Sequence, residues 1–362
     1  MKNRGFAALA GRGGFIVAVL ILHGAAVAAD VQPGPGEIEV APFLLPPSSF
    51  SSPEAQTALV EMQQSARAQQ NQPPGSAVER RARREKELQP ALEAAQRLYP
   101  VTIAAQTMAG VPVDEVLPST GVAPRNRGRV LIELAGGAFT TATRAGGLLE
   151  SAPVASLGGF RVISLHYRQG PEFRFPAASE DVAAVYTELL KHYKARAIGI
   201  YGCSSGAYLT AMSLAWFQVH HLPTPGAVAL LCGSAGRIFE GDSFFTGAAL
   251  MGHAAPRPVT PENPVVQVEY MRDINATDPL AMPVNFPEVL AKFPPTLLIT
   301  GTRDVALSSA SYLHSRLVAL GVTADLHVWD GMWHGFMNYP ALPETREAAQ
   351  VITKFFDREL AR

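Results

Sequence analysis

Short apolar runs alternate with helical stretches from about residue 129 to the C-terminus, and this alternation constrains the fold more than any other feature. Several of the runs are rich in β-branched residues, which is typical of strands buried on both faces of a sheet. Alternating strands and helices predict an α/β fold, in which helices cover both faces of a mostly parallel sheet. The predicted strands are residues 129–134, 160–165, 197–201, 227–231, 296–300 and 324–329, and the predicted helices are residues 177–193, 205–219, 308–320 and 345–360.

The region before this alternation, residues 53–105, carries a helical pattern of its own. Serines followed by an acidic residue in the first turn predict a helix over residues 53–70. A second helix is predicted over residues 77–98, where Pro90 is expected to kink it or to begin a new helix. The segment 30–52 is rich in Pro, Gly and Ser, which predicts a linker or an irregular wrap.

One insertion interrupts the alternation. Residues 233–293 are too many for a plain connection, and they carry aromatic and apolar residues of their own. We expect this insertion and the helices of residues 53–105 to form a cap over an active site in the main domain, residues 106–362.

The first residues, 1–29, have the pattern of a signal peptide. Basic residues precede an apolar run at 14–22, and small residues at 26–29 offer a cleavage site. The apolar run is shorter than the roughly 20 residues that cross a bilayer comfortably. We therefore expect a periplasmic or secreted protein that keeps no stable membrane anchor after processing.

The charge balance excludes one class of partner. The sequence has 30 Lys and Arg residues and 31 Asp and Glu residues. Loss of Lys2, Arg4 and Arg12 with the leader leaves 27 basic residues against 31 acidic ones, a net charge of −4. Such a surface has no electrostatic reason to bind nucleic acid.

The segment Gly202-Cys203-Ser204-Ser205-Gly206 fits the pattern G-x-S-x-G. It follows a predicted buried strand and opens a predicted helix, which is the setting in which this pattern forms a nucleophile elbow. Small residues are needed there because the strand must turn sharply into the helix while the serine stays exposed. A serine that merely caps the helix is the alternative. The two glycines and the strand favour Ser204 as a catalytic nucleophile.

A serine hydroxyl needs a base and an orienting acid, which follow it in the chain in this kind of fold. Asp304 comes directly after the predicted strand 296–300, at the end of the sheet where such sites gather. A helix cap is the alternative for Asp304, and Asp330 is a rival acid. His334 lies on a loop after the last strand, whereas the eight other histidines lie in the leader, the insertion, or earlier strands and helices. We predict Asp304 as the acid and His334 as the base.

The run 135–139, Ala-Gly-Gly-Ala-Phe, follows the first strand of the predicted sheet. Successive small residues let backbone N–H groups turn toward one point, as an oxyanion hole requires. We expect donors at Gly137, Ala138 and Ser205, with Gly136 making the turn. An ordinary glycine-rich turn is the alternative.

Together these segments resemble the hormone-sensitive-lipase-like branch of the α/β-hydrolase esterases, from about residue 110 to the C-terminus. The resemblance implies a capped carboxylesterase that uses neither a metal nor an organic cofactor, acts on esters of short or medium acyl chain, and dimerises through the last strand. The segments that carry it, beside the elbow, are Tyr167-Arg168, Pro171-Glu172, Phe175-Pro176-Ala177-Ala178, Glu180-Asp181, Asp278-Pro279-Leu280, Gly301 to Asp304 and His334-Gly335-Phe336.

The chain departs from the family pattern at several positions, and we expect these changes to affect efficiency and substrate preference more than the fold. The family has His, not Ala135, at the start of the oxyanion motif, and Gly, not Ala138, at its end. Ahead of the nucleophile it usually has Asp, not Cys203, and ahead of the Tyr-Arg pair it commonly has Asp, not His166. After the nucleophile the family has Ala-Gly-Gly, where this chain has Ser205-Gly206-Ala207.

Two cysteines are present, Cys203 and Cys232, at the ends of predicted neighbouring strands. Their placement allows a disulfide that would brace the elbow, or two buried free thiols.

The sequence therefore predicts a serine hydrolase that cleaves carboxylic esters through an acyl-enzyme. A lactonase, amidase or peptidase on the same scaffold would use the same acyl-transfer chemistry. A binding protein that kept the fold without catalysis is a further alternative.

Overall fold

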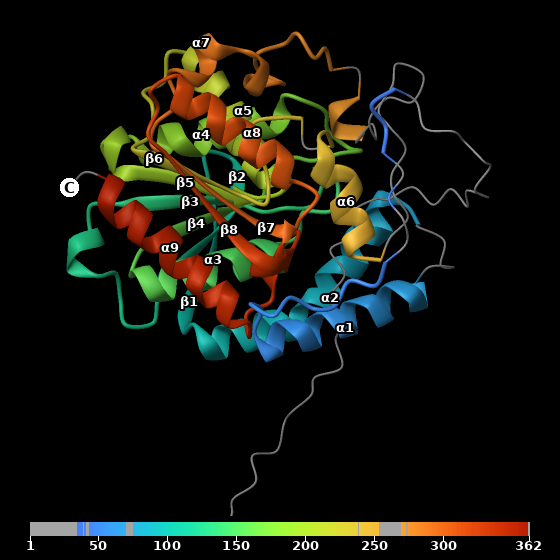
Figure 1. The fold of residues 1–362 in the computed structure, drawn as a ribbon. Coiled ribbons are helices and arrows are strands. Elements are labelled where there is room, and N and C mark those ends of the chain that lie inside the picture. The colour runs from blue at the N-terminus through green and yellow to red at the C-terminus, as the bar shows by residue number, and fades with distance from the viewer. Residues whose placement is uncertain are drawn as a thin grey trace, which may run out of the picture.

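An eight-stranded sheet forms the centre of the computed structural model, and helices cover both of its faces (Figure 1). The structure describes residues 35–38, 40, 43–69, 75–237, 239–252, 269–272 and 274–360, so the predicted signal peptide lies outside the described residues. Within them, no helix combines the length and the apolar character that crossing a membrane requires. The predicted α/β class is confirmed.

The sheet has the strand order β1-β2-β4-β3-β5-β6-β7-β8. Strands β3 to β8 pair in parallel, whereas β1 and β2 form an antiparallel hairpin that joins the sheet beside β4. All six predicted strands are present within a few residues of the expected bounds. The strands are β1 (Val101–Met108), β2 (Val111–Pro118), β3 (Val130–Leu134), β4 (Arg161–Leu165), β5 (Ile198–Cys203), β6 (Ala227–Leu231), β7 (Thr296–Arg303) and β8 (Ala324–Trp333).

The hairpin β1–β2 was not predicted from the sequence. Strand β1 is an edge strand and mostly exposed, so it carries no buried apolar run. The turn at Ala109 and Gly110 has a positive φ at both residues, 49° and 84°, as two-residue hairpin turns favour. The expected domain boundary at residue 105 falls inside β1, which belongs to the sheet.

The helices are divided between the two faces (Figure 1). Helices α4, α5 and α8 pack on one face, and α3 and α9 pack on the other, with α1 and α2 beside them. The described α-helices are α1 (Pro53–Gln69), α2 (Ala77–Leu98), α3 (Arg144–Gly158), α4 (Ala177–Leu189), α5 (Ser205–Val219), α6 (Asp242–Leu250), α7 (Pro287–Leu290), α8 (Leu307–Ala319) and α9 (Pro343–Glu359), and the 3-10 turns are η1 (Pro124–Asn126), η2 (Ala195–Ala197), η3 (Glu269–Met271), η4 (Pro283–Asn285) and η5 (Phe336–Asn338).

Two hydrophobic cores therefore lie on opposite sides of the sheet. Because side chains alternate along a strand, neighbours in one strand belong to different cores. Ile132 packs with α4, α5 and α8, whereas Leu131 packs with α3 and α9. On β5, Ile200 belongs to the same core as Ile132, and Tyr201 belongs to the same core as Leu131. The inner parallel strands are consequently mostly apolar, as the sequence pattern indicated.

Helix α3 was missed because its sequence gives a weak helical signal. It contains three glycines and Pro153, and all but three of its residues are buried. A helix that is buried nearly all round shows no apolar face with a helical period.

Helix α2 runs unbroken through Pro90, so no second helix begins there. It starts at a capping box, in which Ser76 and Glu79 each bond to the other's backbone N–H. Pro90 is exposed, so the carbonyl that loses its helical partner can bond to water.

The described part of the predicted linker lies along the end of the sheet. The Pro46 carbonyl accepts a bond from Arg303 at 2.7 Å, and Ser48 bonds to Asp330. The Ser52 N–H donates to Glu344 of α9 at 2.6 Å. These contacts tie the segment to β7, β8 and α9.

Candidate active site

The turn from β5 into α5 holds Ser204 in a strained conformation, with φ 57° and ψ −118°. A Cβ on Gly206 would lie 1.7 Å from the Leu134 carbonyl oxygen, and one on Gly202 would lie 2.3 Å from the same atom. The elbow thus packs so closely against β3 that only glycine fits on either side of the serine. This is the local geometry that the G-x-S-x-G pattern requires.

Three predicted side chains meet at this end of the sheet. The Nε2 atom of His334 lies 2.8 Å from Oγ of Ser204, and its Nδ1 atom lies 2.7 Å from Oδ1 of Asp304. Asp304 follows β7 and His334 follows β8, so the two come from neighbouring strand ends. The arrangement links nucleophile, base and acid in one hydrogen-bond chain, in which the imidazole can accept a proton from the serine.

Asp304 is fully buried and well supplied with donors. It accepts bonds from the Ala306 N–H at 2.8 Å and the Thr300 hydroxyl at 2.9 Å. Burial acts to raise the pKa of Asp304, but the nearby His334 and these hydrogen bonds outweigh it, so the pKa lies below its ordinary value. Asp304 is therefore a charged acceptor for the imidazole. The rival Asp330 bonds instead to Ser48 and Thr302.

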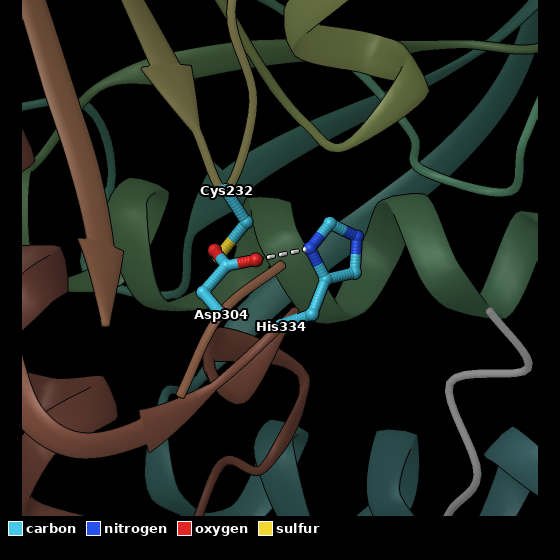
Figure 2. Close-up of side chains that lie close together, drawn as sticks. All are labelled: Cys232, Asp304 and His334. Atoms are coloured by element: carbon cyan, nitrogen blue, oxygen red, sulfur yellow. Dashed lines mark hydrogen bonds and ion pairs between the residues drawn. The ribbon is translucent and has the colours of Figure 1, made fainter. Parts of the chain in front are cut away.

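Cys232 reaches toward the same carboxylate (Figure 2). Its Sγ accepts the Gly335 N–H at 3.2 Å, next to His334, and burial raises the pKa of its thiol. Cys232, Asp304 and His334 place their ligand atoms within 4.8 Å of one another, and they are the group of metal-ligating side chains found among the described residues. Because Asp304 and His334 already bond to each other, this group coincides with the hydrogen-bond chain. Both Cys203 and Cys232 are free, buried cysteines.

The run 135–139 lies directly against the elbow. A Cβ on Gly136 would be 2.9 Å from the Cys203 carbonyl oxygen and 3.3 Å from Cβ of Ser204. Three successive residues have a positive φ: Gly137 at 151°, Ala138 at 50° and Phe139 at 55°. Such a backbone turns consecutive peptide groups out of an extended path, so the residues expected as donors lie beside the serine.

Contacts from other elements fix this loop in place. The Tyr167 hydroxyl donates to the Ala135 carbonyl at 2.6 Å. Phe139 stacks on Tyr270 of the insertion, with ring centroids 4.9 Å apart and an interplanar angle of 11°. The Gly136 N–H donates to a carboxylate oxygen of Glu150, on α3, over a long 3.4 Å.

Only some of the residues that hold this loop in place could be predicted from the sequence. Tyr167 was singled out with its neighbour Arg168, and the structure shows that Arg168 bonds to Asp181 at 2.8 Å. Glu150 and Tyr270 were missed, because α3 was not predicted and Tyr270 lies in the insertion. A glutamate amid apolar and small residues was the available signal for Glu150.

A family model described as the alpha/beta hydrolase fold matches residues 131–338, more than half of the chain and all three members of the hydrogen-bond chain. This chain is an α/β hydrolase. The resemblance to hormone-sensitive-lipase-like esterases is confirmed by solved structures with the same fold.

Curated relatives of this α/β hydrolase carry hydrolase names. An acetyl-hydrolase of Streptomyces hygroscopicus is 30% identical over 236 residues, which cover 64% of this chain and 76% of the relative. An esterase of Acinetobacter venetianus is 26% identical, over 74% of this chain and 87% of the relative.

Solved structures of esterases share the fold of this α/β hydrolase. One crystal structure of an esterase superposes with a TM-score of 0.75 and 28% identity, over 90% of this chain and 99% of its own. Another, of an esterase from the bacterial hormone-sensitive lipase family, has a TM-score of 0.71 and 27% identity, over 86% of this chain and 99% of its own.

Proposed function

We propose that this α/β hydrolase is a serine carboxylesterase that cleaves esters of short to medium acyl chain. The observation that carries the proposal is the chain of short contacts from Ser204 through His334 to Asp304. The names of the relatives, acetyl-hydrolase and esterase, favour an ester over an amide or a peptide as substrate.

The proposed reaction begins when Ser204 attacks the ester carbonyl and His334 Nε2 takes the hydroxyl proton. Asp304 orients the imidazole and stabilises its charged form. The backbone N–H groups of Gly137, Ala138 and Ser205 stabilise the oxyanion. The intermediate collapses, the proton on His334 passes to the leaving alcohol, and an acyl-enzyme remains. A water molecule, deprotonated by His334, then hydrolyses the acyl-enzyme and restores the serine.

The test is hydrolysis of p-nitrophenyl acetate and butyrate by wild type and by Ser204→Ala. We expect the variant to lose at least about 10³-fold in kcat, since a hydroxyl that acts as nucleophile has no substitute. Ser311→Ala, at an exposed position of α8, is the matched control and should keep wild-type activity. A Ser204→Ala enzyme as fast as wild type would refute the assignment.

A fluorophosphonate probe separates an enzyme from a binding protein with the same fold. Because the probe reacts with activated serines, it should label wild type at Ser204 and leave Ser204→Ala unlabelled. A folded wild-type protein that takes up no label would favour the binding protein. A panel of p-nitrophenyl esters of increasing acyl length, with lactone and anilide substrates alongside, measures the acyl-length limit and tests the lactonase and amidase alternatives.

We also propose that the mature protein is exported, on the strength of the charged leader and apolar run in residues 1–29. N-terminal sequencing of the protein recovered from a bacterial host, fraction by fraction, tests this. Export predicts a new N-terminus near residue 30 in the periplasm or the medium, whereas an intact leader in the membrane or cytoplasm would contradict it.

A homodimer through the last strand is a further proposal, and the position of β8 at an edge of the sheet supports it. Strand β8 leaves Val328 43% exposed on that edge. Light scattering should give twice the chain mass, and Val328→Lys should shift the protein to monomer. A monomeric wild type would refute the proposal.

A further inference from the structure

Two buried carboxyl groups lie behind the oxyanion loop. Glu133 on β3 is 0% exposed and Glu150 on α3 is 5% exposed, and their side chains are within hydrogen-bonding reach of each other. Neither residue takes part in the reaction described above. Two ionised carboxylates in such a site would repel strongly, so their presence needs an explanation.

The hydrogen bonds around the pair leave room for one proton between the two carboxyl groups. Oε2 of Glu133 accepts the Ser164 hydroxyl at 2.6 Å, and Oε1 of Glu150 accepts the Gly136 N–H. The two remaining oxygens, Oε1 of Glu133 and Oε2 of Glu150, have no partner within strict hydrogen-bond geometry among the described residues, and the Ser151 hydroxyl lies near enough to Glu133 to act as a donor. A proton between the two carboxyl groups would satisfy one oxygen of each, and the Ser151 hydroxyl can also donate to Glu133.

The surroundings place that proton on Glu133. Burial and the charge of Glu150 raise the pKa of Glu133 well above its ordinary value. Burial also raises the pKa of Glu150, to about 7, but the bond from Glu133 and the Gly136 N–H favour its charged form. The positive Arg84 and the Cys203 N–H act in the same direction.

The charges then balance across three elements. Glu133 is neutral and donates, whereas the pKa of Glu150, raised to about 7 by burial, leaves it charged above that pH, where the positive Arg84 of α2 balances it. Arg84 is half-buried, and its guanidinium Nε is shielded from solvent. A buried carboxylate is tolerated only with such partners.

The position of Glu150 gives it a function. Gly136 precedes the loop donors Gly137 and Ala138, and Cys203 precedes Ser204 and the third donor. One carboxylate thus accepts the Gly136 N–H and lies close to the Cys203 N–H, so it is near both peptide segments from which the oxyanion hole is built. Ala135 has no polar side chain that could do this from within the loop.

We propose that Glu150, buried beside Glu133, is a positioning residue that holds the two halves of the oxyanion hole in register. This inference rests on the proposed esterase function. Glu150 acts through the backbone of Gly136 and Cys203 and does not touch the substrate. Its loss should therefore weaken binding of the transition state more than binding of the ester itself.

The test compares Glu150→Gln with its matched control Glu133→Gln. In Glu133→Gln the amide oxygen can accept from Ser164, and the amide N–H can donate to Glu150. The neutral amide thus replaces the neutral carboxyl group as donor. We expect its kcat to stay within about 3-fold of wild type. Glu150→Gln removes the negative charge that Gly136, Cys203 and Arg84 face, and we expect kcat to fall by about 10- to 100-fold with KM nearly unchanged.

Two readouts exclude a merely structural role. Each kcat value is calculated per active site, and the concentration of active sites is measured by complete reaction with a fluorophosphonate. Misfolded protein is therefore not counted. Affinity for a trifluoromethyl ketone, whose adduct carries an oxyanion, should fall in Glu150→Gln in parallel with kcat/KM. An infrared band of a protonated carboxyl should be present in wild type at pH 7 and absent from Glu133→Gln, whether or not the protein is active.

The outcomes separate this inference from the proposed function. An inactive wild type refutes the esterase function, and the infrared band then still decides whether the pair shares a proton. Active wild type with an unchanged kcat per active site in Glu150→Gln overturns the positioning role. Equal losses in Glu133→Gln and Glu150→Gln also overturn it, because the two residues would then not differ in charge.

Discussion

At Asp304, burial and hydrogen bonding act in opposite directions. A fully buried carboxyl group would ordinarily favour its neutral form, but three donors hold it charged. The charged carboxylate fixes the proton of His334 on Nδ1, which leaves Nε2 free to accept from Ser204. The acid therefore sets the tautomer of the base, a role that its strand-end position alone would not reveal.

Asp304→Asn should lower kcat for p-nitrophenyl acetate by about 10³- to 10⁴-fold with little change in the fold. The reason is that the amide N–H₂ can donate to Nδ1 and so stabilise the tautomer that cannot accept from Ser204. Steady-state kinetics and thermal melting measure the two effects. Asp330→Asn is the control, because Asp330 lies nearby without contacting His334, and it should keep most of the activity. The reverse ranking would assign the acid to Asp330.

The residues of the site differ in how far the sequence reveals them. Ser204, Asp304 and His334 were identified because each follows a strand and they occur in a fixed chain order. Glu133 and Glu150 were not, because a pair of acids has meaning only when both are known to face the same buried space. Their contact joins β3 to α3, a helix that the sequence pattern did not predict.

The elements around the elbow are packed at the limit of atomic contact. Strand β3 passes so close to the turn after β5 that the Leu134 carbonyl faces two glycines. The parallel pairing of Leu134 with Gly202 sets this distance. The position of the nucleophile thus depends on the register between two strands as well as on its own turn.

Gly206→Ala should abolish activity and destabilise the fold, because its Cβ would lie 1.7 Å from the Leu134 carbonyl oxygen and neither backbone can move aside cheaply. Urea unfolding and esterase assays provide the measurement. Gly128→Ala is the matched control, since a Cβ there meets no atom within 4 Å, and it should behave as wild type. A stable, active Gly206→Ala would show that the elbow is looser than the structure indicates.

Strands that are buried on both faces could be predicted from their apolar runs. Elements whose apolar residues follow neither a strand nor a helix spacing could not. The inner parallel strands β3 to β7 have largely apolar runs because both of their faces lie in a core, whereas β8 lies at an edge and is partly exposed. Strand β1 is exposed at the edge, and α3 is buried nearly all round, so neither shows the pattern on which its prediction depends. Helix α2 continues through Pro90 although proline is expected to kink or end a helix. Pro90 is exposed, so the carbonyl without a helical partner can bond to water.

At the scale of the whole molecule, the buried pair makes stability depend on pH. In the unfolded chain Glu133 releases its proton near pH 4.5, its ordinary pKa, whereas in the folded protein it keeps the proton to a much higher pH. Between these two values the folded state binds one more proton, so the free energy of unfolding falls as the pH rises. Asp304 affects the free energy of unfolding in the opposite direction, because its pKa is lower in the folded protein. Its stabilising contribution is lost only as the pH falls through this lowered pKa.

We expect the wild-type free energy of unfolding to fall as the pH rises above about 4.5, the ordinary pKa of Glu133, by up to roughly 1.4 kcal/mol per pH unit from this one group. Glu133→Gln cannot titrate and should show a shallower slope over the same range. Urea denaturation at several pH values measures both curves. Parallel curves for the two proteins would mean that Glu133 does not hold the proton.

The overall architecture followed from the sequence, and the way its outer parts contact the site did not. The alternation of strands and helices was enough to predict the class and a mostly parallel sheet, but it did not predict the strand order. The insertion and the N-terminal helices make their contacts through single residues such as Tyr270 and Arg84, which no periodic pattern marks. Domain boundaries predicted from the sequence therefore do not show which residues of the insertion and the N-terminal helices contact the active site.

The stacking of Phe139 on Tyr270 has a consequence for engineering. Libraries built to admit bulkier esters would naturally target the insertion, because it interrupts the alternation of strands and helices and does not contain the serine. Tyr270, however, supports a ring whose own backbone has a φ of 55°, a conformation that few side chains accept. Diversification that spares this aromatic pair can broaden selectivity, whereas replacement of either ring would cost turnover for every ester alike.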